Sequence, residues 1–155
     1  MSDMSIREEG ERDLVVRRRF RAPPEAVFRA HVEPALIARW MNVGEDWTLD
    51  IAECDARPGG AFRYDYANGE QGFSIQGRFL ELDRPGRILH EETMVMDAAL
   101  GPSRVETLFE AEGAGTRMVM TIRYPDAAAR ARMLEMGMPD GMASCYDALD
   151  ALEIA

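Results

Sequence analysis

Hydrophobic and polar residues alternate along most of the chain between residues 47 and 124. A period of two places successive side chains on opposite faces of a β-strand, so each alternating run is typical of a strand with one apolar face. Turn-forming pairs such as Asn68-Gly69 and Pro85-Gly86 separate the runs. Together with one earlier run, the pattern predicts strands over Leu14–Phe20, Trp47–Cys54, Ala61–Tyr66, Phe73–Leu82, Arg87–Met96, Arg104–Ala111 and Thr116–Tyr124.

Two short helices are expected directly after the first of these strands. Ala22-Pro23-Pro24 ends the strand, because proline cannot donate to a sheet ladder and suits the first turn of a helix. Apolar residues then recur at helical spacing over residues 27–32 and, after Pro34, over residues 36–41. The six later strands have no helical pattern between them, which favours an antiparallel meander.

The period becomes helical after Pro125 and stays helical to the end of the sequence. Asp126 suits an N-cap, and a kink or restart is expected near Met138 because glycine and proline interrupt the pattern over residues 137–141. Apolar residues then recur at steps of three and four up to Leu152. This amphipathic helix needs an apolar surface to cover, and the inner face of the sheet is the large one available.

Strand parity predicts which side chains face this helix. Alternate positions of a strand share a face, and the more apolar set of each strand is assigned to the inside. The inward set is expected to be Phe62, Tyr64, Tyr66, Phe73, Ile75, Gly77, Phe79, Val105, Thr107, Phe109, Met118, Met120, Ile122 and Tyr124.

The strand over residues 87–96 is ambiguous. One parity turns His90 and Glu92 inward with Ile88 and Met94, whereas the other turns Glu91 inward as the single ionisable residue. An inward ionisable pair must be hydrogen-bonded, paired or wet, because an isolated buried charge is costly. Parity alone leaves both arrangements open, and we favour the one with His90 and Glu92 inside.

The length of the chain indicates how many domains it forms, and its net charge indicates which classes of partner it can bind. The 155 residues fit one domain, expected over residues 14–155 behind a flexible, polar tail over residues 1–13. Twenty-eight acidic residues against 18 basic ones give a net charge of −10, which argues against nucleic acid and anionic membranes as partners. We find no run long enough for membrane insertion and no signal-peptide pattern, so a cytoplasmic protein is expected, either a monomer or a homodimer.

The chain has few residues suited to metal or disulfide chemistry. Cys54 and Cys145 are the only cysteines and are expected to be free, buried thiols. His31 and His90 are the only histidines, and without a matching acidic or cysteine cluster they predict neither a metal site nor a cofactor. His31, on the first short helix, is expected to be a core or surface residue rather than a ligand-binding one.

Several short motifs occur in the order and spacing of one known family. They are Phe20-Arg21-Ala22-Pro23-Pro24-Glu25-Ala26-Val27-Phe28-Arg29-Ala30, Trp40, Arg57-Pro58-Gly59-Gly60, Gly77-Arg78-Phe79-Leu80-Glu81-Leu82, Gly115-Thr116-Arg117-Met118 and the run from Gly141-Met142 to Asp147-Ala148-Leu149. Over residues 14 to 153 the sequence resembles the activator of heat-shock-protein-90 ATPase homologue-like family of the START-like, or SRPBCC, superfamily, which includes polyketide cyclase-like proteins. One departure is Trp40-Met41-Asn42-Val43, where the family often has Trp-Trp-Gly-Pro, so a different pocket mouth is expected.

The resemblance implies an α+β helix-grip fold, START-like or Bet v-like, in which a curved antiparallel sheet wraps around a long C-terminal helix. Two short helices follow the first strand in this fold, and a cavity lies between sheet and helix. Eleven methionines are many for this length, and flexible thioethers suit a pocket for varied apolar guests.

The leading functional hypothesis is binding of a small, largely apolar or aromatic ligand in that cavity. Its expected lining is Trp40, Tyr64, Tyr66, Phe73, His90, Glu92, Met118, Met120, Met142 and Tyr146. An alternative is a cyclase- or hydrolase-like enzyme with His90 and Glu92 as its acid–base pair, since a carboxylate fixes the tautomer of imidazole. A third hypothesis, drawn only from the family name, is a chaperone-associated interaction module.

Overall fold

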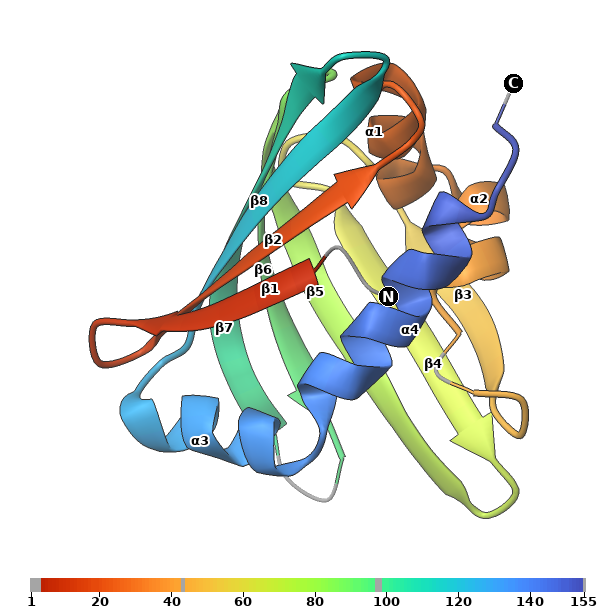
Figure 1. Ribbon diagram of the computed structural model, residues 1–155. Helices are drawn as coiled ribbons and strands as arrows, with labels where there is room; N and C mark the ends of the chain where they lie inside the picture. The colour runs from red at the N-terminus through yellow and green to blue at the C-terminus, as the bar shows by residue number, and fades with distance from the viewer. Residues whose placement is uncertain (1–3, 43, 97–98, 155) are drawn as a thin grey trace.

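One curved sheet dominates the computed structural model, which describes residues 4–42, 44–96 and 99–154. In these residues eight strands form an antiparallel sheet with the order β1-β2-β8-β7-β6-β5-β4-β3. The strands are β1 (Met4–Glu9), β2 (Asp13–Phe20), β3 (Thr48–Cys54), β4 (Ala61–Asn68), β5 (Gln71–Asp83), β6 (Arg87–Val95), β7 (Ala99–Glu112) and β8 (Gly115–Arg123). The helices are α1 (Pro24–Val32), α2 (Pro34–Trp40), α3 (Ala127–Glu135) and α4 (Met138–Asp150). Figure 1 shows the sheet curling around α4, as the α+β helix-grip fold requires.

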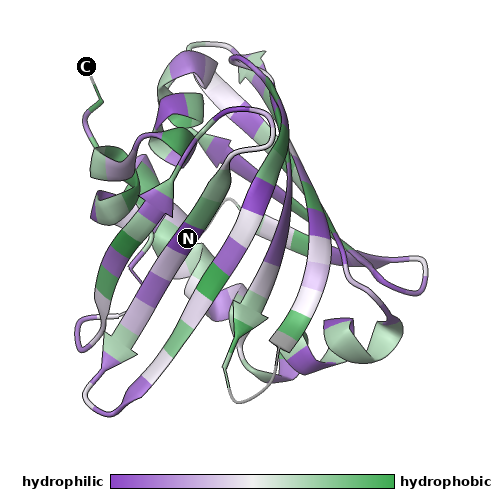
Figure 2. Ribbon diagram, turned by 180° about the vertical axis from the view of Figure 1, so that it is seen from behind, coloured by the Kyte–Doolittle hydropathy of each residue, from purple (hydrophilic) through white to green (hydrophobic). Residues whose placement is uncertain are grey.

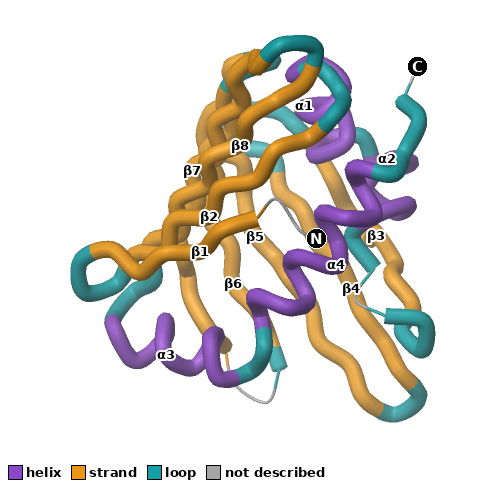
Figure 3. Tube along the Cα trace, in the orientation of Figure 1, coloured by secondary structure: helices purple, strands orange, loops and turns teal. Residues whose placement is uncertain are grey.

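The elements expected from the sequence are present, with shifted ends. The largest shift is in β7, which begins at Ala99 rather than Arg104. The predicted break in the C-terminal helical region is confirmed, because Gly137, with φ 82°, separates α3 from α4. Figure 3 shows the chain changing direction between these two helices. Asp126 caps α3 as predicted, since its carboxylate accepts a hydrogen bond from the backbone N–H of Ala129 at 2.8 Å.

The prediction of a flexible tail over residues 1–13 is wrong for residues 4–9. These residues form β1, which pairs with β2 in the register Ile6↔Val16. Ile6 packs against the hydrophobic core, so even a polar segment gains enough by covering the edge of β2. The two short helices therefore follow the second strand rather than the first. Residues 1–3 of the predicted tail and residue 155 of the predicted domain lie outside the described residues.

The two faces of the sheet differ as strand parity predicts. Seen from the convex side, hydrophilic and hydrophobic positions alternate along the strands (Figure 2). On the concave side most of the predicted inward set is buried, namely Phe62, Tyr64, Tyr66, Phe79, Val105, Thr107, Phe109, Met118, Met120, Ile122 and Tyr124. The alternation therefore determines which face of the sheet α4 covers.

Gly77 marks a close approach between the neighbouring strands β5 and β6. A Cβ atom added there would lie 1.9 Å from the carbonyl oxygen of Glu91 and 2.7 Å from Cζ of Phe62, so only glycine fits. The β5–β6 register shifts nearby, between Phe79 and Glu81, and such bulges bend a strand. These features accompany the curl of the sheet that leaves room beneath α4.

Helix α4 is held to the sheet by its second half. Its buried residues, Cys145, Tyr146 and Leu149, all lie there. Beside them Arg18 of β2, whose side chain is 4% exposed, lies 2.7 Å from Asp147 Oδ1 through Nη1 and 3.7 Å from Asp150 Oδ2 through Nη2. A guanidinium so far removed from water requires such carboxylates, because an unpaired buried charge is costly.

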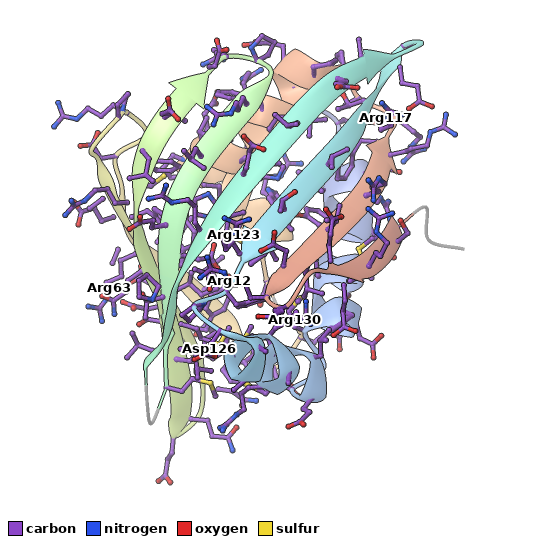
Figure 4. The ribbon with its side chains drawn as sticks, turned by 90° about the vertical axis from the view of Figure 1, so that its left-hand side faces the viewer. Arg12, Arg63, Arg117, Arg123, Asp126 and Arg130 are labelled. Carbon is purple, nitrogen blue, oxygen red and sulfur yellow. The ribbon has the colours of Figure 1, made fainter. Side chains whose placement is uncertain are left out.

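Helix α3 is attached to the β1–β2 hairpin through a residue of its first turn, rather than through buried side chains. All of α3 is described, and none of its residues is buried. Nη1 of Arg130 donates to the carbonyl oxygens of Gly10 and Asp13 at 3.1 and 3.0 Å, which ties the helix to the β1–β2 hairpin. Figure 4 shows Arg130 on this side of the molecule, with Arg63 and Arg117 pointing away from the sheet. Within the described residues no helix is long and apolar enough to span a bilayer.

Replacing Asp147 with asparagine tests the attachment of α4. Arg18 would keep its buried charge but lose the carboxylate that lies 2.7 Å from its Nη1, so the free energy of unfolding should fall by about 1.5–3 kcal/mol, the usual size for a hydrogen bond to a charged group. Urea denaturation followed by circular dichroism measures the change.

Glu110→Gln is the matched control for this variant. It also removes one carboxylate from an arginine pair, but the pair with Arg117 is more than half exposed on both sides. Its effect should stay below about 0.5 kcal/mol. Equal losses in the two variants would contradict the assigned role of Arg18.

Candidate functional site

A cavity of about 460 Å³ lies between the concave face of the sheet and the helices. Strands β4, β5, β6, β7 and β8 supply one wall, and α4 supplies much of the other. The first half of α4 contributes Met138, Gly141 and Met142, and the anchored second half contributes Cys145 and Tyr146. The cavity therefore lies between the strands and α4.

Nine of the ten side chains predicted to line the cavity do so. They are Trp40, Tyr64, Tyr66, Phe73, His90, Glu92, Met120, Met142 and Tyr146. Met118 does not, contrary to the prediction. It shares the inward face of β8 but stands opposite Arg18 and Phe109 in the register, and its side chain is fully buried in the core.

Sequence reasoning missed several lining residues. His31, Trp47 and Met136 line the cavity, although His31 was expected to be an ordinary core or surface residue. The spacing of four from Val27 to His31 was the available signal, since it places the histidine on the buried face of α1. Nothing local indicated the other two, because both lie outside regular helices and strands.

The aromatic side chains of the wall have their polar atoms occupied. Nε1 of Trp40 donates to the carbonyl oxygen of Ala30 at 2.8 Å, and the hydroxyl of Tyr66 donates to that of Met41 at 2.9 Å. The hydroxyl of Tyr146 points to Met120 Sδ at 3.6 Å. Burial raises the pKa of Tyr66 and Tyr146, so both hydroxyls stay protonated near neutral pH. These rings therefore present mainly apolar surface to the cavity.

Stacking fixes the orientation of these rings. Trp40 stacks on Tyr146 with centroids 5.6 Å apart, which joins α2 to α4. Tyr66 stacks on Phe73 with centroids 4.7 Å apart and an interplanar angle of 12°, which joins β4 to β5. Such pairs stabilise beyond their buried area and restrict ring motion. The aromatic part of the wall is therefore preformed.

His90 and Glu92 form a hydrogen-bonded pair on the cavity wall. Both line the cavity together with Ile88 and Met94, so the strand parity that we favoured is confirmed. Nε2 of His90 lies 2.7 Å from Oε1 of Glu92, and the side chains are 17% and 35% exposed. The carboxylate accepts this hydrogen bond, so Nε2 carries the hydrogen. A pair held in this way meets the requirement that an inward ionisable pair be satisfied.

His31 is held in one neutral form at the edge of the cavity. Its Nδ1 donates to the carbonyl oxygen of Val27 at 2.8 Å, whereas Nε2 is sealed from solvent and has no partner in the described part of the chain. The ring lies 5.0 Å from those of Trp40 and Phe109. Burial is the main reason that the pKa of His31 is lowered to about 4, and it outweighs the hydrogen bond to Val27, which acts in the opposite direction. Near pH 7 the ring is therefore uncharged.

The two cysteines are free thiols, as expected. Cys145 is buried and lines the cavity, and its burial raises the pKa of the thiol to about 11. Cys54 is only half-buried, so the prediction of burial holds for Cys145 alone. A thiol with a raised pKa is a poor nucleophile, which favours a packing role for Cys145.

Comparison with known proteins gives a single family. The sequence profile of the family described as "Activator of Hsp90 ATPase homolog 1-like protein" matches residues 21–153. No protein with a curated description matches the sequence.

Solved structures from several bacteria share the fold. One from Rhodobacter sphaeroides has 26% identity and a TM-score of 0.85, with 97% of this chain and 99% of that chain covered. One from Nitrosomonas europaea has 26% identity and a TM-score of 0.78, covering 92% and 94%. A protein from Mycobacterium smegmatis, at 20% identity, has a TM-score of 0.87 with 97% and 96% covered, and this last likeness concerns the fold alone.

The neutral state of His31 predicts a pH dependence of stability. The unfolded chain takes up a proton near pH 6.5, but the folded ring does so only near pH 4, so lowering the pH through this window favours unfolding. A shift of this size corresponds to about 3 kcal/mol, present in full above pH 6.5 and lost by pH 4. Urea denaturation at several pH values should show the loss.

His31→Phe isolates this contribution from that of the carboxylates, which titrate in the same range. The variant keeps a ring between Trp40 and Phe109 and removes the titrating nitrogens. Its free energy of unfolding relative to wild type should therefore improve steadily from pH 6.5 to pH 4. Parallel curves for the two proteins would contradict the buried, neutral assignment.

Proposed function

This chain belongs to the Activator of Hsp90 ATPase homolog 1-like family, within the START-like superfamily, and we propose that it binds a small, largely apolar molecule between its sheet and α4. The family is known for binding hydrophobic ligands. The observation that carries the proposal is the preformed cavity, whose lining is apolar except for a few polar groups. Binding sites for small molecules commonly combine these two features.

The size and texture of the cavity support a ligand of moderate size. A volume of about 460 Å³ falls within the range of about 300–1,000 Å³ that is usual for sites of drug-sized molecules. Eight methionines line it, namely Met41, Met94, Met96, Met120, Met133, Met136, Met138 and Met142. Their flexible thioethers adapt to differently shaped apolar guests. The aromatic rings of the wall are held in place by stacking. The flexible methionines lie mostly on the helical side of the cavity and near its rim.

The exposed methionines indicate where a ligand enters. Met96 follows β6 and Met136 follows α3, and they are 41% and 42% exposed while also lining the cavity. Apolar side chains open to water at the rim of a cavity are typical of a ligand entrance. We therefore assign the mouth to the region between the end of β6 and the α3–α4 junction.

Gly141→Leu tests the proposal. Gly141 lines the cavity inside α4, and a Cβ atom added there would meet no atom within 4 Å. Leucine should therefore occupy ligand space without a clash, and leaving glycine should stabilise the helix by about 1 kcal/mol. Wild type should show saturable binding of the uncharged dye Nile red, measured by its fluorescence and by quenching of Trp40 and Trp47, and Gly141→Leu should lose at least tenfold in affinity.

Gly141→Ala is the matched control, because it gives the helix the same gain and fills little of the cavity. Its affinity for Nile red should stay within about threefold of wild type. Native mass spectrometry of the purified protein, looking for a small molecule that copurifies, gives an independent readout. An absence of saturable binding in wild type, or binding unaffected by Gly141→Leu, would refute the cavity as the site.

An acid–base enzyme is the second candidate, favoured by the hydrogen bond between His90 and Glu92. With Nε2–H donated to Glu92 at 2.7 Å, Nδ1 of His90 is the ring nitrogen left to accept a proton. If the protein turns over a bound ligand, His90→Ala and Glu92→Gln should each lower kcat at least a hundredfold while leaving the unfolding transition in place. Ligand binding by wild type with no product detected by mass spectrometry would exclude this candidate.

A further inference from the structure

The charge on the cavity wall has one sign only. Of the described residues that line the cavity, Glu92 is the single carboxylate and none is arginine or lysine. A carboxylate or phosphate group of a ligand would find no fixed positive partner here and would face Glu92 instead. Anions are therefore disfavoured in this cavity.

On the cavity wall Glu92 lies beside a glycine that is covered by an aromatic ring. In the register Glu92 stands beside Gly77 of β5, which has no side chain, and Gly77 in turn stands beside Phe62 of β4. The ring of Phe62 reaches over this glycine, because its Cζ would lie 2.7 Å from a Cβ atom at residue 77. An aromatic ring thus borders the space next to the carboxylate.

Only one oxygen of this carboxylate is occupied within the described residues. Oε1 accepts the hydrogen bond from His90 at 2.7 Å, which fixes the orientation of the group. With the side chain 35% exposed, Oε2 remains accessible to a donor in the cavity. Burial is the main cause of the raised pKa of Tyr64, Tyr66 and Tyr146, and Glu92 contributes to all three, as expected if its field reaches across the cavity.

We propose that the ligand is an organic cation, an apolar or aromatic molecule whose ammonium group binds the carboxylate of Glu92. This inference rests on the proposed binding function and specifies its ligand class. The ammonium group donates to Oε2, and its alkyl substituents lie against aromatic faces, which attract cations through their quadrupole. The apolar body of the ligand occupies the space lined by methionines. His90 acts as a positioning residue that holds the carboxylate.

The overall charge supports the same class of ligand. A net charge of −10 gives the protein a field that attracts cations and repels anions during diffusional encounter. The field of the whole molecule and the single charge in the cavity therefore favour the same ligands.

Three probes of matched shape test the proposal: naphthylmethylamine, which is protonated at pH 7, naphthylmethanol, which is neutral, and naphthoate, which is anionic. Displacement of Nile red and isothermal titration calorimetry measure their affinities for the 155-residue protein. The amine should bind about tenfold more tightly than the alcohol, equivalent to about 1.4 kcal/mol, and the anion should bind most weakly.

Glu92→Gln and Glu91→Gln form the matched pair of variants. Both remove one negative charge from β6, but Glu91 points to the opposite face, where it pairs with Arg104 at 2.8 Å. In Glu92→Gln the amine should lose its advantage while the alcohol stays within about threefold, and Glu91→Gln should behave as wild type. Thermal unfolding of both variants checks that the fold is kept.

The outcomes separate this inference from the proposed function. Equal binding of amine and alcohol, tight binding of naphthoate, or an amine preference that survives in Glu92→Gln would overturn the cation proposal while cavity binding stands. If neither Nile red nor any naphthalene probe binds wild type, the cavity function fails and the cation proposal falls with it.

Discussion

The architecture depends on where α4 is attached to the sheet. The buried guanidinium of Arg18 holds Asp147 and Asp150 at one end of the helix, and Tyr146 and Leu149 pack beside this contact. The other end, with Met138 and Gly141, lines the cavity over the concave sheet. Because a helix is stiff, attaching one end of α4 to the sheet also determines how far the other end lies from the strands. This distance determines the space available for the cavity.

Most polar side-chain groups around the cavity are hydrogen-bonded within the protein, whereas the carboxylate of Glu92 has an oxygen left for a ligand. The hydroxyls of Tyr66 and Tyr146 and the indole N–H of Trp40 are bound to neighbouring protein atoms, which fixes the aromatic wall. His31 is neutral and donates within its own helix. Glu92 is different, because within the described residues only one of its oxygens accepts a hydrogen bond and its side chain is 35% exposed. The cavity is therefore apolar with a single charged position, and such a position determines ligand class more than apolar area does.

The sequence predicted much of this arrangement for a simple reason. Side-chain alternation along a strand is a local property, so Tyr64, Tyr66 and Met120 were correctly assigned to the inner face, and the break at Gly137 followed from helix propensity. The same local reasoning failed for residues 4–9, where pairing with the edge of β2 outweighed a polar composition. It also left the orientation of His90 and Glu92 open, because both parities of that strand carry ionisable residues.

By itself the sequence determined the α+β class, the inward faces of the strands, the break before α4 and nine of the ten predicted cavity residues. Only the tertiary structure decided that Met118 is sealed in the core, that His31 borders the cavity and that Glu92 lines it beside Gly77. The physical reason is that periodicity fixes the direction of a side chain relative to its own element. Its depth and neighbours depend on how far α4 and the adjoining strands stand from it, and residues far apart in the chain set those distances.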